Sequence, residues 1–310
     1  MFTLAIAVSV FTAPALSQQS VPQNRFRVLC YNVENLFDIV DDSLTRDEEY
    51  LPGGMRGWNY SRYQRKLIHI GRVLVGGGWD SPAVVGLCEI ESRKALLDLT
   101  MYSPLKNLAY KFVHYESPDA RGVDVALLYQ PEFFKTLHHY PIRISYPHAP
   151  DSRTRDILYV AGKVPTGDTL HCFVCHFPSR LGGELESEQN RIFVASVVRN
   201  KVDSIVAQNK TAKILIMGDF NDYPDNQSML NVLQAKEYGQ SDSQLFNLMF
   251  PLHKKGKGTH KHAGEWGTLD QMIVSKALLD LSSDFRTKPD GACILDLPFL
   301  LTEDKQYLGL

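Results

Sequence analysis

The stretch ILIMGDFND, residues 214–222, contains the pattern on which the fold prediction rests. A short apolar run, 214–218, is followed at once by Asp219 and Asn221. Such a run is typical of a strand that is buried on both faces of a sheet. Asp219 and Asn221 could be simple turn formers. Alternatively, they are functional, because a buried carboxylate costs free energy unless it is paired or bound to a metal.

Other apolar runs, at 26–31, 83–88, 123–129, 170–175 and 269–274, are also predicted to be strands, and all but that at 123–129 have such polar residues at or near an end. Asn32 and Glu34 follow the first of these, Glu89 follows the second, and His176 follows the fourth. Asp270 lies inside the last. If these strand ends share one rim, their hard oxygen ligands suit Mg²⁺ or Mn²⁺ better than zinc. Taken singly, Glu89 could instead pair with Arg93, and His176 could be an ordinary strand-end histidine.

Two helices are predicted between the strands. Tyr63, Leu67, Ile70 and Leu74 recur at three- and four-residue spacing, which marks one apolar helix face, and three glycines at 76–78 then end the helix. Valines and an isoleucine at 194–205 predict a second helix. Alternating strands and helices indicate an α/β protein.

Composition excludes several classes of protein. Of 310 residues, 44% are hydrophobic and 22% charged, so the chain is globular rather than disordered. The net charge of −2 provides no global positive field for holding nucleic acid, so a phosphate-bearing substrate needs a local site. Cys172 and Cys175 form a C-x-x-C within an apolar run, and we expect buried small side chains rather than a redox or zinc pair.

The first 17 residues carry no charge and contain an apolar stretch too short to span a bilayer. Small residues at Ala15 and Ser17 predict a signal peptide, 1–17, cleaved before Gln18. We therefore expect export, to the periplasm or outside the cell, and a mature domain at 18–310. The alternatives are a wrongly assigned start codon and a buried N-terminal strand.

A set of motifs occurs in order along the chain: YNVENLFD (31–38), GLCEIE (86–91), RGVDVALLY (121–129), HFPSR (176–180), MGDFND (217–222) and LDQMIVS (269–275). The set resembles the endonuclease/exonuclease/phosphatase superfamily of deoxyribonuclease-I-like phosphoesterases, in particular its exported bacterial branch. The resemblance implies a four-layer α/β sandwich, in which two packed β-sheets are flanked by helices.

The resemblance also implies roles for single residues. Glu89 resembles the main metal-ligating glutamate, and Glu34 lies close to the metal. Asp219 and Asn221 match the pair that handles the attacking water and the phosphoryl oxygens. The remaining candidates are His176 near the scissile phosphate, Asp270, which matches an aspartate that orients a catalytic histidine, and Asn32, Arg180 and Arg191 as phosphate contacts. For the two arginines, a salt bridge to Glu184, Glu186 or Glu188 is the alternative.

The family pattern ends in Ser-Asp-His, and this sequence contains no such tripeptide. We therefore expect a fragment that lacks the last C-terminal strand, or else a degenerate member that binds without efficient turnover. Losing an acid–base histidine typically costs about 10²–10⁴-fold in rate. Weak or no turnover is expected of the chain as written.

These observations predict a Mg²⁺- or Mn²⁺-dependent hydrolase of phosphodiesters or phosphomonoesters, most simply an exported endonuclease-like monomer. A basic segment at 254–262 suits a DNA backbone, although a solvated surface loop would look the same. The alternatives are a catalytically impaired phospho-ligand-binding protein and a lipid or inositol phosphatase. No membrane span and no stable protein partner are implied.

Overall fold

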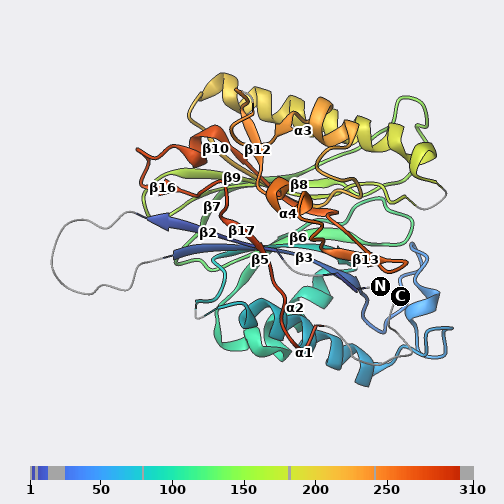
Figure 1. Ribbon diagram of the computed structural model, residues 1–310. Coiled ribbons are helices and arrows are strands. Elements are labelled where there is room, and N and C mark those ends of the chain that lie inside the picture. Colours follow the sequence, from blue (N-terminus) through green and yellow to red (C-terminus); the bar gives the residue numbers. More distant parts are fainter. Residues whose placement is uncertain are drawn as a thin grey trace.

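The computed structural model describes residues 2–3, 6–12, 25–78, 80–180, 183–240 and 242–300. Its centre consists of two mixed β-sheets packed face to face (Figure 1). The first sheet has the order β16 (Phe285–Arg286), β2 (Ile6–Thr12), β3 (Arg25–Leu36), β4 (Val84–Ile90), β6 (Asp124–Tyr129), β5 (Lys111–His114), with β17 (Ala292–Ile294) also pairing with β2. The second has the order β11 (Ala235–Lys236), β12 (Leu245–Asn247), β15 (Asp270–Ser275), β10 (Lys213–Asp219), β9 (Thr169–His176), β8 (Ile157–Lys163), β7 (Lys135–Ile142).

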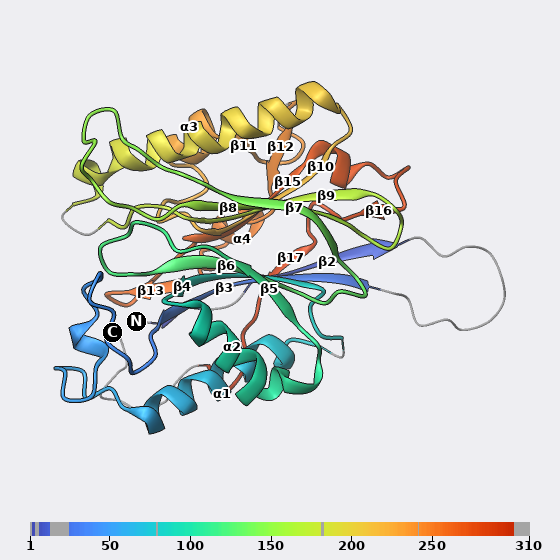
Figure 2. The ribbon, with the colours of Figure 1, turned by 180° about the vertical axis from the view of Figure 1, so that it is seen from behind.

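Helices cover the outer faces of both sheets (Figure 2). Helices α1 (Tyr60–Gly76) and α2 (Arg93–Tyr102) cover the first sheet, and the long helix α3 (Glu184–Gln208) covers the second. The remaining elements are α4 (Phe250–His253), short helical turns at Glu48–Tyr50, Pro104–Asn107, Ser228–Val232 and Lys276–Leu279, and a small sheet of β1 (Phe2–Thr3), β13 (His260–His262) and β14 (Glu265–Gly267). This is the predicted four-layer sandwich.

Each central strand is apolar on both faces because each face is covered. In β3, Val28 and Cys30 belong to the core between the sheets, while Leu29 packs against α1 and α2. In β9, Cys172 lies in the core between the sheets and Cys175 lies under α3. The two thiols therefore point to opposite faces of the sheet, and the prediction of buried, unpaired cysteines is confirmed.

The register of the second sheet gathers the polar strand ends. Strand β10 runs parallel to β9 and antiparallel to β15, so Asp219 lies beside His176 on one side and beside Asp270 on the other. In the first sheet, β3 and β4 are parallel and Asn32 lies beside Cys88, the residue before Glu89. The polar ends of β3, β4, β9 and β10 thus meet at one end of the sandwich.

All six predicted strands are present, as β3, β4, β6, β9, β10 and β15, and both predicted helices are present, as α1 and α3. Within the described residues, no helix is long and apolar enough to span a membrane. Strand β2, at Ile6–Thr12, lies in the stretch predicted to be a signal peptide and pairs antiparallel with β3. The predicted cleavage position lies outside the described residues, and export stays a prediction.

Candidate active site

Two irregularities in the first sheet carry acidic residues. The register of β3 against β4 shifts between Asn32 and Leu36, and that of β4 against β6 shifts between Cys88 and Ile90. Glu34 and Glu89 lie in these shifts with φ angles of 54° and 66°, a conformation that is strained for non-glycine residues. Such bulges and strained residues concentrate at functional sites, where they re-aim a side chain.

Asn32 joins the ends of the two sheets. Its amide nitrogen Nδ2 donates to Glu89 Oε1 at 3.2 Å and to Asp219 Oδ2 at 3.1 Å. His176 Nε2 lies 3.8 Å from the same two carboxylate oxygens. Four of the predicted site residues, from β3, β4, β9 and β10, thus face one point.

Buried carboxylates crowd this point, and the charge of Arg155 offsets part of the pKa shift of Asp219. Burial raises the pKa of Asp219 to about 6, and the neighbouring Glu89 adds to the shift. Burial and the charge of Asp219 raise the pKa of Asp270 well above its usual range. Asp270 is 1% exposed, and its Oδ1 has no hydrogen-bond partner in the described part of the chain.

His176 is held in its neutral form. Burial lowers the pKa of its imidazole well below the usual range, and the cations Arg155 and Arg121 lower it further. Its Nδ1 has no hydrogen-bond partner in the part of the chain that the structure describes. Neutral imidazole can donate a hydrogen bond from one nitrogen or accept one at the other.

Asn221 and Arg180 shape the loop that follows β10. The backbone N–H of Asn221 donates to Asp219 Oδ1 at 2.9 Å, and its side-chain Nδ2 donates to the Phe177 carbonyl at 3.0 Å. Arg180 Nε donates to the Asn221 carbonyl at 2.7 Å, and its guanidinium also pairs with Glu184 at 3.1 Å. The glutamate pairing proposed as an alternative for Arg180 is therefore present, and Arg180 holds Asn221 in place.

Arg191 is buried beside a carboxylate. Its side chain is fully buried, and its Nε lies 2.7 Å from Asp222 Oδ1. The other guanidinium nitrogens donate to Ser187 Oγ at 2.6 Å and to the Glu184 carbonyl at 2.8 Å. The geometry favours a structural salt bridge, although the carboxylate partner is Asp222 rather than a glutamate of the same helix.

Three supporting residues carry no motif in the sequence. Arg155 donates to the backbone carbonyls of His176 and Phe177 at 3.2 and 2.7 Å. Lys66, on α1, donates to the Glu34 carbonyl at 2.6 Å. Thr259 Oγ1 accepts a hydrogen bond from the Asp270 backbone N–H at 3.0 Å. Arg155 and Lys66 act on His176 and Glu34 from 21 and 32 residues away, whereas Thr259 is 11 residues from Asp270.

These residues fit a hard divalent cation. Glu89 and Asp219 supply the carboxylate oxygens that such a cation prefers, and the amide nitrogen of Asn32 donates to both. Burial raises the pKa of Asp219, and Asp270 keeps an unsatisfied oxygen; a bound cation would stabilise the ionised form of both carboxylates. Glu34 lines an adjacent cavity of about 210 Å³ together with Tyr31, His69 and Arg72.

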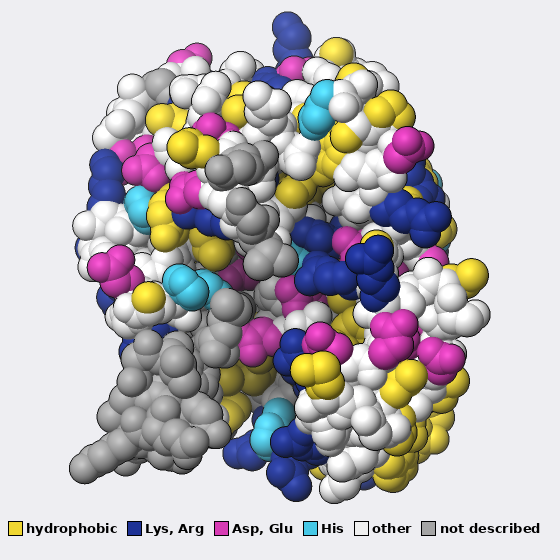
Figure 3. Space-filling view, turned by 90° about the vertical axis from the view of Figure 1, so that its right-hand side faces the viewer, with side chains coloured by type: hydrophobic (Ala, Val, Ile, Leu, Met, Phe, Trp, Pro, Cys, Tyr) yellow, Lys and Arg dark blue, Asp and Glu magenta, His cyan; other side chains and the backbone are white. Residues whose placement is uncertain are grey.

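Figure 3 shows the end of the molecule where these strands end. Acidic side chains lie in a hollow at the centre of this face, and Lys and Arg side chains flank it. The basic flanks suit an anionic substrate, and the acidic centre suits a cation.

Residues 27–310 match the model of the endonuclease/exonuclease/phosphatase family, and the chain belongs to that family. Similar solved structures include the human Nocturnin catalytic domain with bound sulfate (16% identity, 86% of this chain and 94% of that one, TM-score 0.54). A second is a Bacteroides thetaiotaomicron mannosyl-6-phosphatase (14% identity, 86% of this chain and 98% of that one, TM-score 0.54). A third is D. rerio TDP2 with a single-strand DNA product (16% identity, 82% of this chain and 84% of that one, TM-score 0.51). The search of curated proteins gave no match. The chain thus has the hydrolase fold of a family whose members include nucleases and phosphatases.

Proposed function

We propose that this protein is a Mg²⁺- or Mn²⁺-dependent phosphoester hydrolase of the endonuclease-like type, acting on phosphodiesters. The observation that carries the proposal is the convergence of Glu89, Asp219 and His176 around the amide of Asn32. A carboxylate cluster beside a neutral histidine provides both a cation site and a hydrogen-bond donor for phosphoryl oxygens.

Each residue then has a defined part in the chemistry. Glu89 and Asp219 would hold the cation, and a bound cation would neutralise charge on the phosphoryl group and polarise it. Asp219, whose Oδ1 is fixed by the Asn221 N–H, orients the attacking water. His176 Nε2 donates to a phosphoryl oxygen, and Asn32 keeps the two sheet ends at a fixed separation.

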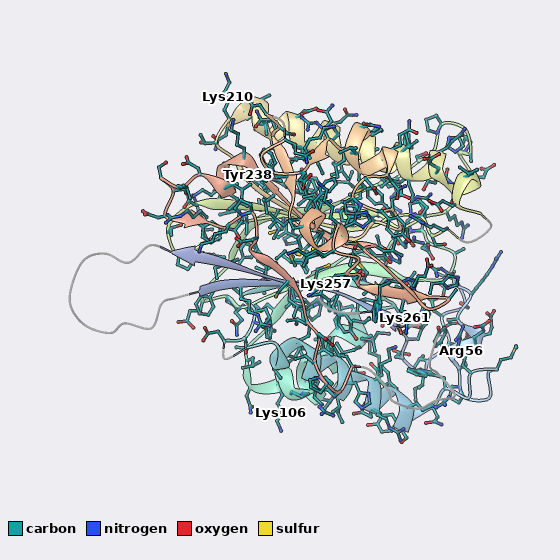
Figure 4. All side chains as sticks on the ribbon, viewed as in Figure 1. Arg56, Lys106, Lys210, Tyr238, Lys257 and Lys261 are labelled. Atoms are coloured by element: carbon teal, nitrogen blue, oxygen red, sulfur yellow. The ribbon has the colours of Figure 1, made fainter. Side chains whose placement is uncertain are left out.

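A nucleic-acid substrate is supported by the segment 254–262. Lys257 is exposed and Lys261 is half-buried, and both lie on the stretch between α4 and β14 (Figure 4). Thr259, between the two lysines, hydrogen-bonds the backbone of Asp270, so this segment is tied directly to the site. Cations placed beside a metal-dependent site can hold the flanking phosphates of a polynucleotide. D. rerio TDP2, a fold neighbour, carries a DNA product.

Export is part of the proposal and rests on the uncharged, apolar N-terminus and on the small residues Ala15 and Ser17. N-terminal sequencing of protein from the native source checks it. A mature chain that begins at Gln18 supports export, and one that begins at Met1 contradicts it.

The activity is tested with plasmid DNA, a single-stranded oligonucleotide, a phospholipid and a sugar phosphate, each with Mg²⁺ or with EDTA. We expect slow cleavage of DNA that requires the metal and is lost in Glu89→Gln. The matched control is Asp242→Asn at an exposed carboxylate that pairs with Lys276 on the surface. Turnover of the sugar phosphate or the lipid but not of DNA would reassign the substrate. Ligand binding without any turnover would favour the impaired binding protein.

A further inference from the structure

A second cluster of ligating side chains lies outside the network of Glu89, Asp219 and His176. It is formed by His114 at the end of β5, Glu116 just after it and Asp124 at the start of β6. One potential ligand atom from each of the three lies within 4.8 Å of the others. In the described part of the chain, no hydrogen bond joins this trio to the first site.

The trio is held in place by its surroundings. The side chains of His114 and Asp124 are both 2% exposed, and His114 Nε2 lies 3.1 Å from Asp124 Oδ2. Asp124 Oδ1 accepts a hydrogen bond from the Ser117 N–H at 2.9 Å, which fixes the carboxylate. Glu116 is exposed and closes the cluster from the solvent side, with Oε1 3.8 Å from His114 Nδ1.

A further buried carboxylate lies near Asp124. Asp156, just before β8 in the other sheet, is 5% exposed, and neither of its carboxylate oxygens accepts a hydrogen bond of ordinary geometry. Its nearest cation, Arg143, is 3.4 Å away. Asp156 and Asp124 line the same small cavity, of about 10 Å³, which has room for about one water or ion.

We propose that His114, Glu116 and Asp124 bind a divalent cation of the zinc type, separate from the cation of the first site. One imidazole nitrogen with two carboxylates is a donor set that borderline cations accept and that Mg²⁺ and Ca²⁺ do not prefer. Ligands around Zn²⁺ at about 2.0–2.1 Å lie about 3.4 Å apart, so Glu116, which lies beside His114 Nδ1, would turn toward the Nε2 side, where Asp124 lies. The cation would join His114 of β5 to Asp124 of β6, two neighbouring strands of the same sheet.

The test uses the full chain carrying Glu89→Gln, so that the first site is disabled and the proposed function does not affect the readout. Zn²⁺ alone is the probe, with Mg²⁺ as the comparison. Metal retained after desalting is measured by mass spectrometry, and Tm is measured with and without Zn²⁺. We expect about one bound Zn²⁺ per chain and a higher Tm with Zn²⁺ than with Mg²⁺.

Adding Glu116→Gln weakens Zn²⁺ binding by more than about tenfold and abolishes the rise in Tm. Because Glu116 is exposed, this change leaves the metal-free fold intact, and the metal-free Tm verifies that. Glu132→Gln, at another exposed glutamate, leaves Zn²⁺ binding unchanged. No Zn²⁺ retained in the Glu89→Gln protein, or equal retention with and without Glu116, would overturn the proposal and leave His114 as an ion-pair partner of the two carboxylates.

Discussion

Gly218 lies directly against the carbonyl oxygen of Cys175 on the neighbouring parallel strand. A Cβ at Gly218 would be 1.8 Å from that oxygen, and the residue has a φ of 146°. Only glycine permits this approach, which brings β10 against β9 immediately before Asp219 and His176. The glycine of the GDFND sequence therefore has a structural role in forming the site.

Gly218→Ala is predicted to destabilise the protein by about 3 kcal/mol or more, because both a clash and an unfavourable φ are introduced. Gly167→Ala is the matched control. Gly167 has a φ of 88°, but a Cβ added there would meet nothing within 4 Å, so only the backbone cost of about 1–2 kcal/mol applies. Urea unfolding measures the free energy of unfolding of both variants, provided that the m-value stays constant. Equal losses in the two variants would contradict the close approach of β10 to β9.

Arg191→Met is predicted to cost about 3 kcal/mol of stability, because it leaves the buried Asp222 with only its longer, 3.5 Å contact to Arg180. Arg56→Met breaks an ion pair whose two side chains are both more than half exposed, and it should cost less than about 1 kcal/mol. Thermal unfolding measures the stability of both variants against the parent. If Arg191→Met folds with normal stability and instead raises KM, Arg191 binds substrate after all.

Lys257→Ala combined with Lys261→Ala is predicted to weaken DNA binding and to flatten its salt dependence. The logarithm of the DNA-binding constant falls linearly with the logarithm of the salt concentration, and each lost phosphate contact on duplex DNA makes this slope less steep by about 0.9. Lys106→Ala with Lys210→Ala is the matched pair, since these exposed lysines lie on other parts of the surface (Figure 4). Binding is measured between about 50 and 200 mM salt, concentrations over which such contacts weaken. An unchanged slope in the first pair would assign segment 254–262 to an ordinary solvated loop.

A pH dependence is predicted at His171. Burial, with His138 and Lys201 nearby, lowers the pKa of His171 to about 4, and its Nδ1 lies 2.7 Å from the Tyr159 hydroxyl. Because the unfolded chain binds a proton near pH 6.5 and the folded chain does not, stability is full above about pH 6.5 and falls as the pH drops toward 4. His171→Gln should lose stability less steeply over this range in urea titrations, whereas His148→Gln, at an exposed position, should follow the parent.

Much of the fold was predictable because both faces of each central strand are covered, which leaves continuous apolar runs such as 214–218. The site was predictable where polar residues directly follow such runs, as with Glu89 and Asp219. The roles of Arg155 and Lys66 were not predictable, since they hold backbone carbonyls far away in sequence and show no local pattern. For Arg191 the sequence left a phosphate contact and a salt bridge open, and it did not indicate Asp222 as the carboxylate partner, because Asp222 lies outside the helix that carries Arg191.

The most direct test of the account counts bound Mn²⁺ in the metal-stripped parent and in Glu89→Gln, by electron paramagnetic resonance. The account predicts that Glu89→Gln binds one Mn²⁺ fewer than the parent, while Asp242→Asn binds as many as the parent. Equal Mn²⁺ binding in the parent and in Glu89→Gln would contradict the claim that Glu89 and Asp219 hold the cation of a phosphoester hydrolase.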